Sequence, residues 1–290
     1  MTSLPILKFK YKDICCNYDG SIYVVCTLNG KIFKNTECIL DKSDAKFTSI
    51  SCSKDLKYIH AIDSTSNLIY SSNDFGVSFK TDNIILYKTS KLSCSFDGKI
   101  IIIATQIQEP NYKIRVYYSN DYGYSFLYGD YYLGVPTQIS MNYDGSIIYI
   151  SSINAISKST DYGITWTKIS TDGPTNITCS GSGRIVYYIK KSLINKSVDF
   201  GNTWESIQIS SNYDYKYITC CENGCKVFIA TYYPDVYINT GYNNDFITTN
   251  LSFGPFIGKP TFISSICCNN DGSICYISNE SGEIYQIKNN

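Results

Sequence analysis

The sequence is poor in the residues that most often carry charge recognition and catalysis. It has only two arginines, Arg115 and Arg184, and one histidine, His60, in 290 residues. Lys plus Arg and Asp plus Glu each number 25, so the formal net charge is zero. A neutral chain has no overall positive field to attract phosphate, so we expect no nucleic-acid partner. His60 lies in an alternating stretch, YIHAI, and a single histidine there gives no support for Ser-His or Cys-His catalysis.

Long hydrophobic runs are absent as well. No stretch approaches the roughly 20 apolar residues that a membrane-spanning helix needs. The first residues, MTSLPILKFKYKD, contain no apolar run of signal-peptide length. We therefore expect no membrane span and a cytoplasmic location. The richness in Ile, Lys, Asn and Tyr is typical of an AT-rich genome, such as that of a large DNA virus of protists, for which a viral factory or virion is an alternative location.

Cysteine, in contrast, is abundant, with 13 residues. The number is odd, no export signal is visible, and the chain is long enough to fold without covalent cross-links. Reduced thiols are therefore expected. The segments CCENGC and CCNNDGSIC have the closest cysteine spacing, but no histidine accompanies them, and we predict neither a metal site nor a cofactor.

A hairpin pattern recurs seven times. Each copy has an alternating strand, a turn of the Asp-Gly type and a second strand rich in β-branched residues, which is a strong hairpin signal. The first copy reads ICCNYDGSIYVV, and in the second copy Leu56 takes the place of the turn glycine. The copies begin at Ile14, Ile50, Leu92, Ile139, Ile177, Ile218 and Ile266. A repeat at this spacing is typical of propeller blades.

The second half of each repeat adds two further strands, so that every repeat supplies the four strands of one blade. The last repeat ends after its third strand, and an unassigned apolar segment, PILKFKY, precedes the first repeat. The sequence therefore predicts an all-β fold, with residues 1–290 forming a single seven-bladed β-propeller. Residues 5–11 are expected to be the closing strand of the last blade, which would remove an open sheet edge.

A second motif, S-x-D-x-G-x-[TS]-[WF], ends the third strand of four repeats. It resembles the Asp-box, or BNR repeat, of sialidases, the sortilin luminal domain, some glycoside hydrolases and a family of photosystem assembly factors. The aspartates can accept backbone N–H groups within the turn, and the glycines permit a positive φ. The resemblance implies a structural role at the propeller periphery for Asp74, Gly76, Asp121, Gly123, Asp161, Gly163, Trp166, Asp199, Gly201 and Trp204.

The same resemblance argues against catalysis. A sialidase needs three arginines to hold its substrate, and this chain has two in all. General glycoside hydrolysis needs two opposed carboxylates, and no spacing singles out such a pair. We expect no enzymatic activity.

Six blades carry a cysteine at one first-strand position, with small residues beside it, which fits crowded strands near an axis.

A partner is expected to bind loops that differ between repeats, on the face opposite the regular turns. These loops are rich in aromatic residues, which are favoured at interfaces, although Tyr is frequent throughout the chain and composition alone would give the same pattern. The candidates are Tyr112, Tyr128, Tyr131, Tyr132, Tyr213, Tyr215, Tyr232, Tyr233, Phe253 and Phe256. The leading hypothesis is a scaffold for a protein partner. The alternative is a carbohydrate-binding propeller or degenerate glycoside hydrolase, in which Tyr and Trp stack on sugars.

Overall fold

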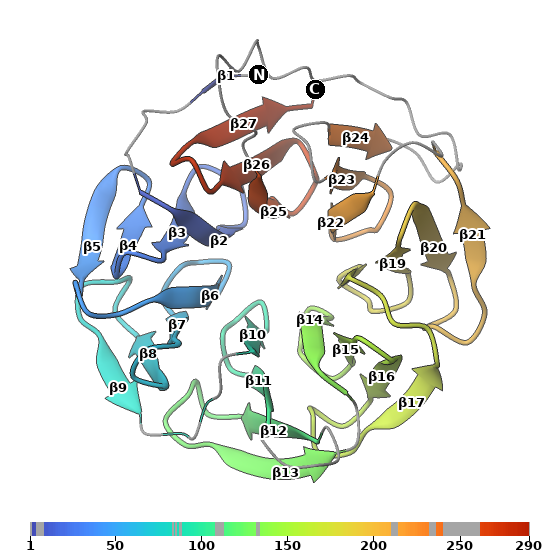
Figure 1. Cartoon of the computed structure of the whole chain (residues 1–290), viewed down its shortest axis with the longest axis horizontal. Coiled ribbons are helices and arrows are strands. Elements are labelled where there is room, and N and C mark those ends of the chain that lie inside the picture. Colours follow the sequence, from blue (N-terminus) through green and yellow to red (C-terminus); the bar gives the residue numbers. More distant parts are fainter. Residues whose placement is uncertain are drawn as a thin grey trace.

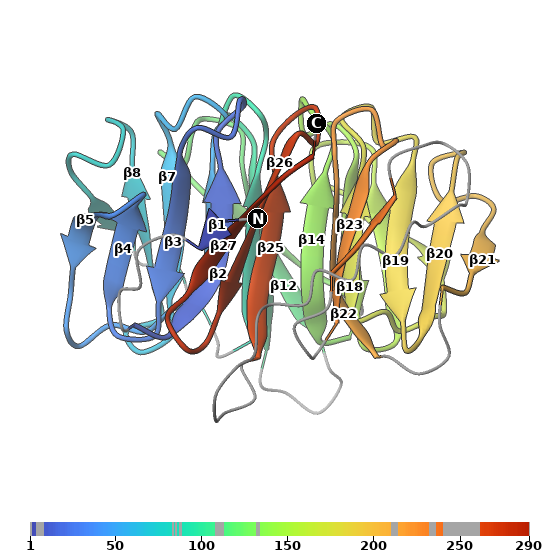
Figure 2. The same ribbon diagram turned by 90° about the horizontal axis from the view of Figure 1, so that it is seen from above.

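The computed structural model describes residues 2–3, 9–82, 84, 86, 89–107, 113–131, 134–209, 214–231, 236–239 and 262–289. The strands form seven small sheets arranged as a ring around a central axis (Figure 1). Within each sheet the strands follow one another from the axis outward, and Figure 2 shows the inner strands running between the two faces of the ring. This arrangement confirms the predicted seven-bladed β-propeller.

The strands of each blade have the following bounds. Blade 1 contains β2 (Tyr11–Cys16), β3 (Tyr23–Thr27), β4 (Lys31–Lys34) and β5 (Glu37–Asp41). Blade 2 contains β6 (Phe47–Cys52), β7 (Ile59–Asp63), β8 (Leu68–Ser72) and β9 (Lys80–Asp82). Blade 3 contains β10 (Ser90–Cys94), β11 (Ile101–Gln106), β12 (Ile114–Ser119) and β13 (Leu127–Tyr131). Blade 4 contains β14 (Pro136–Met141), β15 (Ile148–Ser152), β16 (Ala155–Ser159) and β17 (Thr167–Ser170).

The remaining blades complete the ring. Blade 5 contains β18 (Asn176–Cys179), β19 (Val186–Lys190), β20 (Leu193–Ser197) and β21 (Glu205–Ile207). Blade 6 contains β22 (Tyr215–Cys220), β23 (Val227–Thr231) and β24 (Val236–Asn239). Blade 7 contains β25 (Ile263–Cys268), β26 (Ile274–Asn279) and β27 (Ile284–Lys288), with β1 (Thr2–Ser3) outermost. In blade 6 three strands fall within the described residues, and residues 240–261, which follow them, lie outside these residues.

An N-terminal strand closes the ring, as predicted, but it is not the predicted segment. Thr2 pairs with Gln286 and Ser3 with Tyr285, so β1 is the outer strand of blade 7. Of the segment 5–11, residues 5–8 lie outside the described residues, and Tyr11 begins β2, the innermost strand of blade 1. Tyr11 is 1% exposed, so its ring belongs to the core.

The core consists of seven clusters, one between each pair of neighbouring blades. Successive residues of a strand point to opposite faces of its sheet. In β3, Val24 therefore packs toward blade 2, whereas Val25 packs toward blade 7. Since both faces of the inner sheets are covered, all five residues of β3, β7, β15 and β23 are buried. The outer strands are mostly exposed, as in β5 and β17.

The first turns and the Asp-box turns lie on the same face of the ring. The amide of Phe75 in an Asp-box donates to the carbonyl of Lys57, which directly follows the first turn of the same blade, at 3.2 Å. The Tyr122–Lys99 and Phe200–Arg184 pairs repeat this bond in blades 3 and 5. We call this side the turn face. The opposite side, the loop face, carries the second-to-third strand connections and the connections between blades.

Candidate functional site

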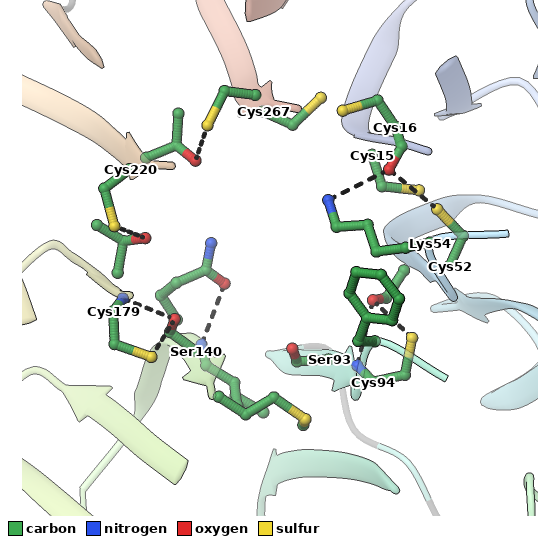
Figure 3. A pocket seen from close by; sticks show the side chains of 18 of the residues that line it. Cys15, Cys16, Cys52, Lys54, Ser93, Cys94, Ser140, Cys179, Cys220 and Cys267 are labelled. Carbon is green, nitrogen blue, oxygen red and sulfur yellow. Dashed lines mark hydrogen bonds between the residues drawn. The ribbon is translucent and has the colours of Figure 1, made fainter. Parts of the chain in front are cut away.

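A channel runs along the propeller axis. Its cavity has a volume of about 270 Å³ and is lined by the innermost strand of every blade and, in blades 2 to 7, by residues of the turn that follows this strand. Figure 3 looks into this cavity and shows side chains from all around the ring converging on it. Within the described part of the chain, the cavity brings together residues of all seven repeats, so it is the main candidate for a binding site.

A closed circle of backbone hydrogen bonds surrounds the channel at the turn face. Each bond runs from an amide of one blade to a carbonyl of the next, with N···O distances between 2.6 and 3.0 Å. The donors and acceptors follow the order Tyr18, Lys54, Phe96, Tyr143, Gly181, Glu222, Asn270 and back to Tyr18. Each such bond contributes roughly 0.5–1.5 kcal/mol, and together they fix the diameter and shape of the opening.

We call these seven residues the mouth column, since each is the residue directly before the Asp-Gly pair or its counterpart in its repeat. Three of them form an aromatic shelf. The rings of Phe96 and Tyr143 stack with centroids 3.8 Å apart and planes at 19°, and Tyr18 meets Phe96 edge-on at 5.7 Å. Tyr18 is 50% exposed and Tyr143 43% exposed. The shelf therefore offers apolar ring faces to solvent from a rigid backbone.

Charges of opposite sign flank the channel. Lys54 of blade 2 projects into it and donates to the carbonyl of Cys16 at 3.4 Å. Burial opposes the charge of Lys54, but attraction to the sulfurs of Cys16 and neighbouring cysteines outweighs it, so the pKa of Lys54 is raised. Glu222 of blade 6, across the ring, accepts a hydrogen bond on its carboxylate from the side-chain amide of Asn270. Among the residues that line the cavity, Lys54 is the one cationic side chain.

The acidic group at the other end of the channel, Asp13, accepts hydrogen bonds on both of its carboxylate oxygens. Asp13 accepts bonds from the hydroxyls of Ser265 at 2.7 Å and Ser49 at 3.2 Å, and from the amides of Ile14 and Ile50. These donors belong to blades 7, 1 and 2. The carboxylate therefore joins three blades near the point where the chain ends meet, and its lone pairs are used for structure.

The cysteines that the sequence placed near the axis do line the channel. In several junctions the hydroxyl of one blade contacts the thiol of the next, as for Ser51 with Cys94 at 3.2 Å and Ser140 with Cys179 at 3.3 Å. All thirteen cysteines are free. Within the described part of the chain, no group of three or more His, Cys, Asp and Glu side chains is arranged to hold a metal ion.

The Asp-boxes lie away from the channel, and each forms the same closed set of hydrogen bonds. In the first, Ser72 donates its hydroxyl to Asp74 and accepts the amide of Gly76, while Asp74 accepts both the amide and the hydroxyl of Ser78. The hydroxyl and amide of Ser78, followed by Ser72, lower the pKa of Asp74 to about 2. The pattern recurs around Asp121, Asp161 and Asp199, with Gly123, Gly163 and Gly201.

The aromatic residues that end the Asp-boxes are half-buried. Trp166 packs on the cluster between blades 3 and 4, and its indole N–H donates to the carbonyl of Gly163 at 3.0 Å. Trp204 packs edge-on against Tyr188, with ring centroids 4.7 Å apart. In each box the residue before the glycine also has a positive φ, for example 60° at Tyr162. These side chains and turns hold the outer strand against its neighbours.

Three of the loop-face partner candidates fall within the described residues, and none of them lies in a loop. Tyr215 is the first residue of β22, is 2% exposed and packs edge-on against Tyr237, so its assignment to a partner surface is wrong. Tyr128 and Tyr131 belong to the outer strand β13. Tyr128 lies against the guanidinium of Arg115 at 4.3 Å, and Tyr131 donates to the carbonyl of Ile164 at 2.6 Å. The other candidates lie outside the described residues: Tyr112, Tyr132, Tyr213, Tyr232, Tyr233, Phe253 and Phe256.

The sequence reasoning missed the mouth column because it lies in the regular turns. A usable signal was present, however. Within the repeated hairpin, the residue at this position changes from Tyr to Lys, Phe, Gly, Glu and Asn. A position that varies inside a repeated frame is free of the packing that fixes its neighbours.

Comparison of the sequence with protein-family models finds no match, and comparison with curated proteins finds none either. Solved structures share the fold. A structure described as YCF48 bound to D1 peptide matches with a TM-score of 0.74 at 13% identity, over 100% of this chain and 96% of that one. Hydrazine synthase of Kuenenia stuttgartiensis matches with a TM-score of 0.73 at 12% identity, over 99% and 97%. At such identities the likeness establishes the propeller fold alone.

In the part of the chain that the structure describes, no helix has the length and apolar character that a membrane crossing requires.

Proposed function

We propose that the protein is a non-enzymatic binding module that holds a peptide segment of a protein partner over the turn-face opening of its channel. One observation carries this proposal. The aromatic shelf of Tyr18, Phe96 and Tyr143 stands beside the cavity, with Lys54 and Glu222 on opposite sides of it. Exposed aromatic rings on a rigid frame, flanked by charges, suit the side chains and dipoles of a peptide.

The arrangement of the acidic groups supports a binding role over a hydrolytic one. Glycoside hydrolysis requires two free carboxylates facing each other across the substrate. Among the residues lining the cavity, Asp13 is held by four donors and Glu222 by Asn270. The carboxylates of the channel are therefore engaged in holding the ring.

The solved structure of YCF48, which is described as bound to D1 peptide, supports the peptide as the kind of partner. That description concerns YCF48, and we extend it here only to the class of ligand. The proposal also moves the contact from the loop face to the turn face, because Tyr215 is buried and Tyr128 and Tyr131 lie on the outer strand of blade 3.

Selection of phage-displayed random peptides on the purified protein tests this function. We expect binding peptides whose affinity falls at least about tenfold, or 1.4 kcal/mol, with Tyr143→Ala, because the variant removes the most accessible stacked ring. Glu222→Gln should change the salt dependence of binding, because it removes a charge and keeps a partner for Asn270.

Tyr124→Ala is the matched control, since Tyr124 is also on the turn face and is 67% exposed but belongs to a peripheral Asp-box. It should leave the affinity unchanged. Peptides that bind all three variants equally would contradict the proposed site. Saturable binding to a glycan array, with no peptide selected, would favour the carbohydrate-binding alternative, in which Tyr18 and Tyr143 stack on sugar rings.

A further inference from the structure

The first turn of blade 6 differs from the other first turns at two positions. In every blade, the residue before the mouth-column residue accepts a backbone amide across the turn with its side chain, as Asn142 accepts the amide of Ile147 at 2.9 Å. This residue is Asn or Ser in six blades and Cys221 in blade 6. The residue four positions later is Ser, Lys or Arg in those six blades and Cys225 in blade 6. The turn of blade 6 therefore keeps the common frame but carries two thiols.

This frame directs the two side chains toward each other. In blades 1, 4 and 7 the corresponding side chains are joined by a hydrogen bond from Asn to Ser, at 3.0–3.1 Å. In blade 6 the sulfurs of Cys221 and Cys225 lie 3.9 Å apart. A disulfide forms when two such side chains rotate so that the sulfurs close to about 2.0 Å.

Neither cysteine is the residue that the turn itself would favour. A sulfur is a weaker acceptor than a hydroxyl or amide oxygen, so Cys221 holds the amide of Lys226, at 3.1 Å, less firmly than Asn or Ser would. Cysteine is among the most buried residue types, yet Cys225 is only partly buried. The pair therefore offers a reactivity that the structure of the turn does not require.

Burial gives the two cysteines different roles. Cys225 is partly exposed on the turn face, where a small molecule in solution can reach it. Cys221 is 1% exposed, donates its thiol proton to Asn223 at 2.9 Å and contacts the sulfur of Cys225. Burial raises the pKa of Cys221, so this residue remains a thiol. Within the described residues, the two sulfurs belong to no group of three or more side chains that could hold a metal ion, and this favours a bond between the sulfurs over a metal site.

We propose that Cys221 and Cys225 are a reversible disulfide site that reacts with small disulfides such as oxidised glutathione. The thiol of Cys225 loses its proton, and the thiolate attacks one sulfur of the small disulfide, which forms a mixed disulfide and expels the other half as a thiolate. Cys221 then loses its proton and attacks the sulfur of Cys225, and the second half leaves as a thiolate. The two released thiolates take up the two protons. Two cysteine thiols are oxidised to one disulfide, and one small disulfide is reduced to two thiols.

The surroundings of the turn support reversibility. The amide of Glu222 donates to the carbonyl of Asn270 at 2.8 Å, and its carbonyl accepts the amide of Gly181 at 2.6 Å. The hydroxyl of Tyr187, from blade 5, donates to the carbonyl of Gly224 at 2.9 Å. These bonds hold the backbone between the two cysteines from both sides of the blade. They keep the thiols adjacent after reduction, so the disulfide can form again.

The test treats the full-length reduced protein with oxidised glutathione in the presence of a metal chelator. After an acid quench, free thiols are blocked with light N-ethylmaleimide in denaturant, disulfides are reduced, and the released thiols take a heavy label. Tandem mass spectrometry of the tryptic peptide 217–226 reads the label at Cys220, Cys221 and Cys225 separately. We expect heavy label on Cys221 and Cys225, on the order of tenfold above that on Cys220, and its loss when dithiothreitol precedes the quench. Light label on Cys221 or Cys225 after oxidation, or heavy label on Cys220 in place of either, would overturn the proposal.

Two single variants separate the chemistry from the fold. Cys221→Ser restores the residue found at this position in blades 2, 3 and 5, and Cys225→Ser restores that of blades 1, 4 and 7, so both should fold. Cys221→Ser should keep a stable glutathione adduct on Cys225, because the thiol that displaces glutathione has been removed. Cys225→Ser should leave Cys221 unmodified, because Cys221 is buried. An adduct on Cys221, or none on Cys225 in the first variant, would show that the assigned roles are wrong.

Discussion

Lowering the pH from 7 to 4 is expected to reduce the free energy of unfolding by about 3 kcal/mol through His60 alone. The side chain is fully buried in β7, its Nδ1 lies 2.9 Å from the hydroxyl of Ser71, and its Nε2 has no hydrogen-bond partner among the described residues. Burial disfavours the charged imidazolium and lowers the pKa of His60 from 6.5 to about 4.

The sign of the effect follows from proton binding. Between pH 6.5 and 4 the unfolded chain protonates its histidine and the folded protein does not, so acid favours unfolding. A difference of this size in pKa corresponds to about 3 kcal/mol, most of which is lost before pH 4 is reached. Chemical denaturation at a series of pH values gives the free energy of unfolding and its slope.

His60→Asn is the control, because asparagine can keep the bond to Ser71 and does not titrate. The variant should be less stable at pH 7, since it leaves a small cavity, but its stability should vary much less between pH 6.5 and 4. Parallel pH profiles for the two proteins would show that His60 is accessible to protons in the folded state and would contradict the account.

Asp161→Ala is expected to lower the free energy of unfolding by about 2–3 kcal/mol. Asp161 accepts the hydroxyl of Ser159, the amide of Thr165 at 2.8 Å and the hydroxyl of Thr165 at 2.5 Å. Its removal leaves the buried Ser159 with one acceptor fewer and releases the start of β17. A hydrogen bond to a charged group contributes about 1.5–3 kcal/mol. Because Asp161 is partly exposed, the three bonds together contribute less than the sum of these values. The Tm should fall by about 5–10 °C.

Peptide binding by Asp161→Ala distinguishes a structural from a functional Asp-box. Below its Tm the variant should bind the selected peptides as the unmodified protein does, because the motif lies away from the channel. Asp144→Ala, in a first turn where the carboxylate accepts only Ser146, should cost less stability. A stable Asp161→Ala protein that has lost peptide binding would reverse the assignment.

The fold was predictable from the sequence because its signals are local and repeated. The conformation of each Asp-Gly hairpin and Asp-box depends on residues within about ten positions of one another. Leu56 shows that the hairpin forms even where its turn glycine is replaced. It takes the place of the turn glycine, adopts a φ of 64° and is held there by burial at 3% exposure. Seven copies of such a unit leave few arrangements other than a ring.

The parts that were not predictable depend on contacts between blades. Whether Tyr215 faces solvent or the core is decided by blade 5, whose Tyr187 and Ile189 share its cluster. The pairing of β1 with β27 depends on the opposite end of the chain. The candidate site at the mouth column forms only when Tyr18, Lys54, Phe96, Tyr143, Gly181, Glu222 and Asn270 are brought into one circle.

Photo-crosslinking of a selected peptide tests the central claim most directly. A benzophenone amino acid is placed at position 143 on the turn-face opening, at 124 on the periphery, or at 153, an exposed position in the β15–β16 connection on the loop face. The account predicts a covalent peptide adduct from position 143 and none from the other two. An adduct from position 153, with none from position 143, would place the partner on the loop face and contradict it.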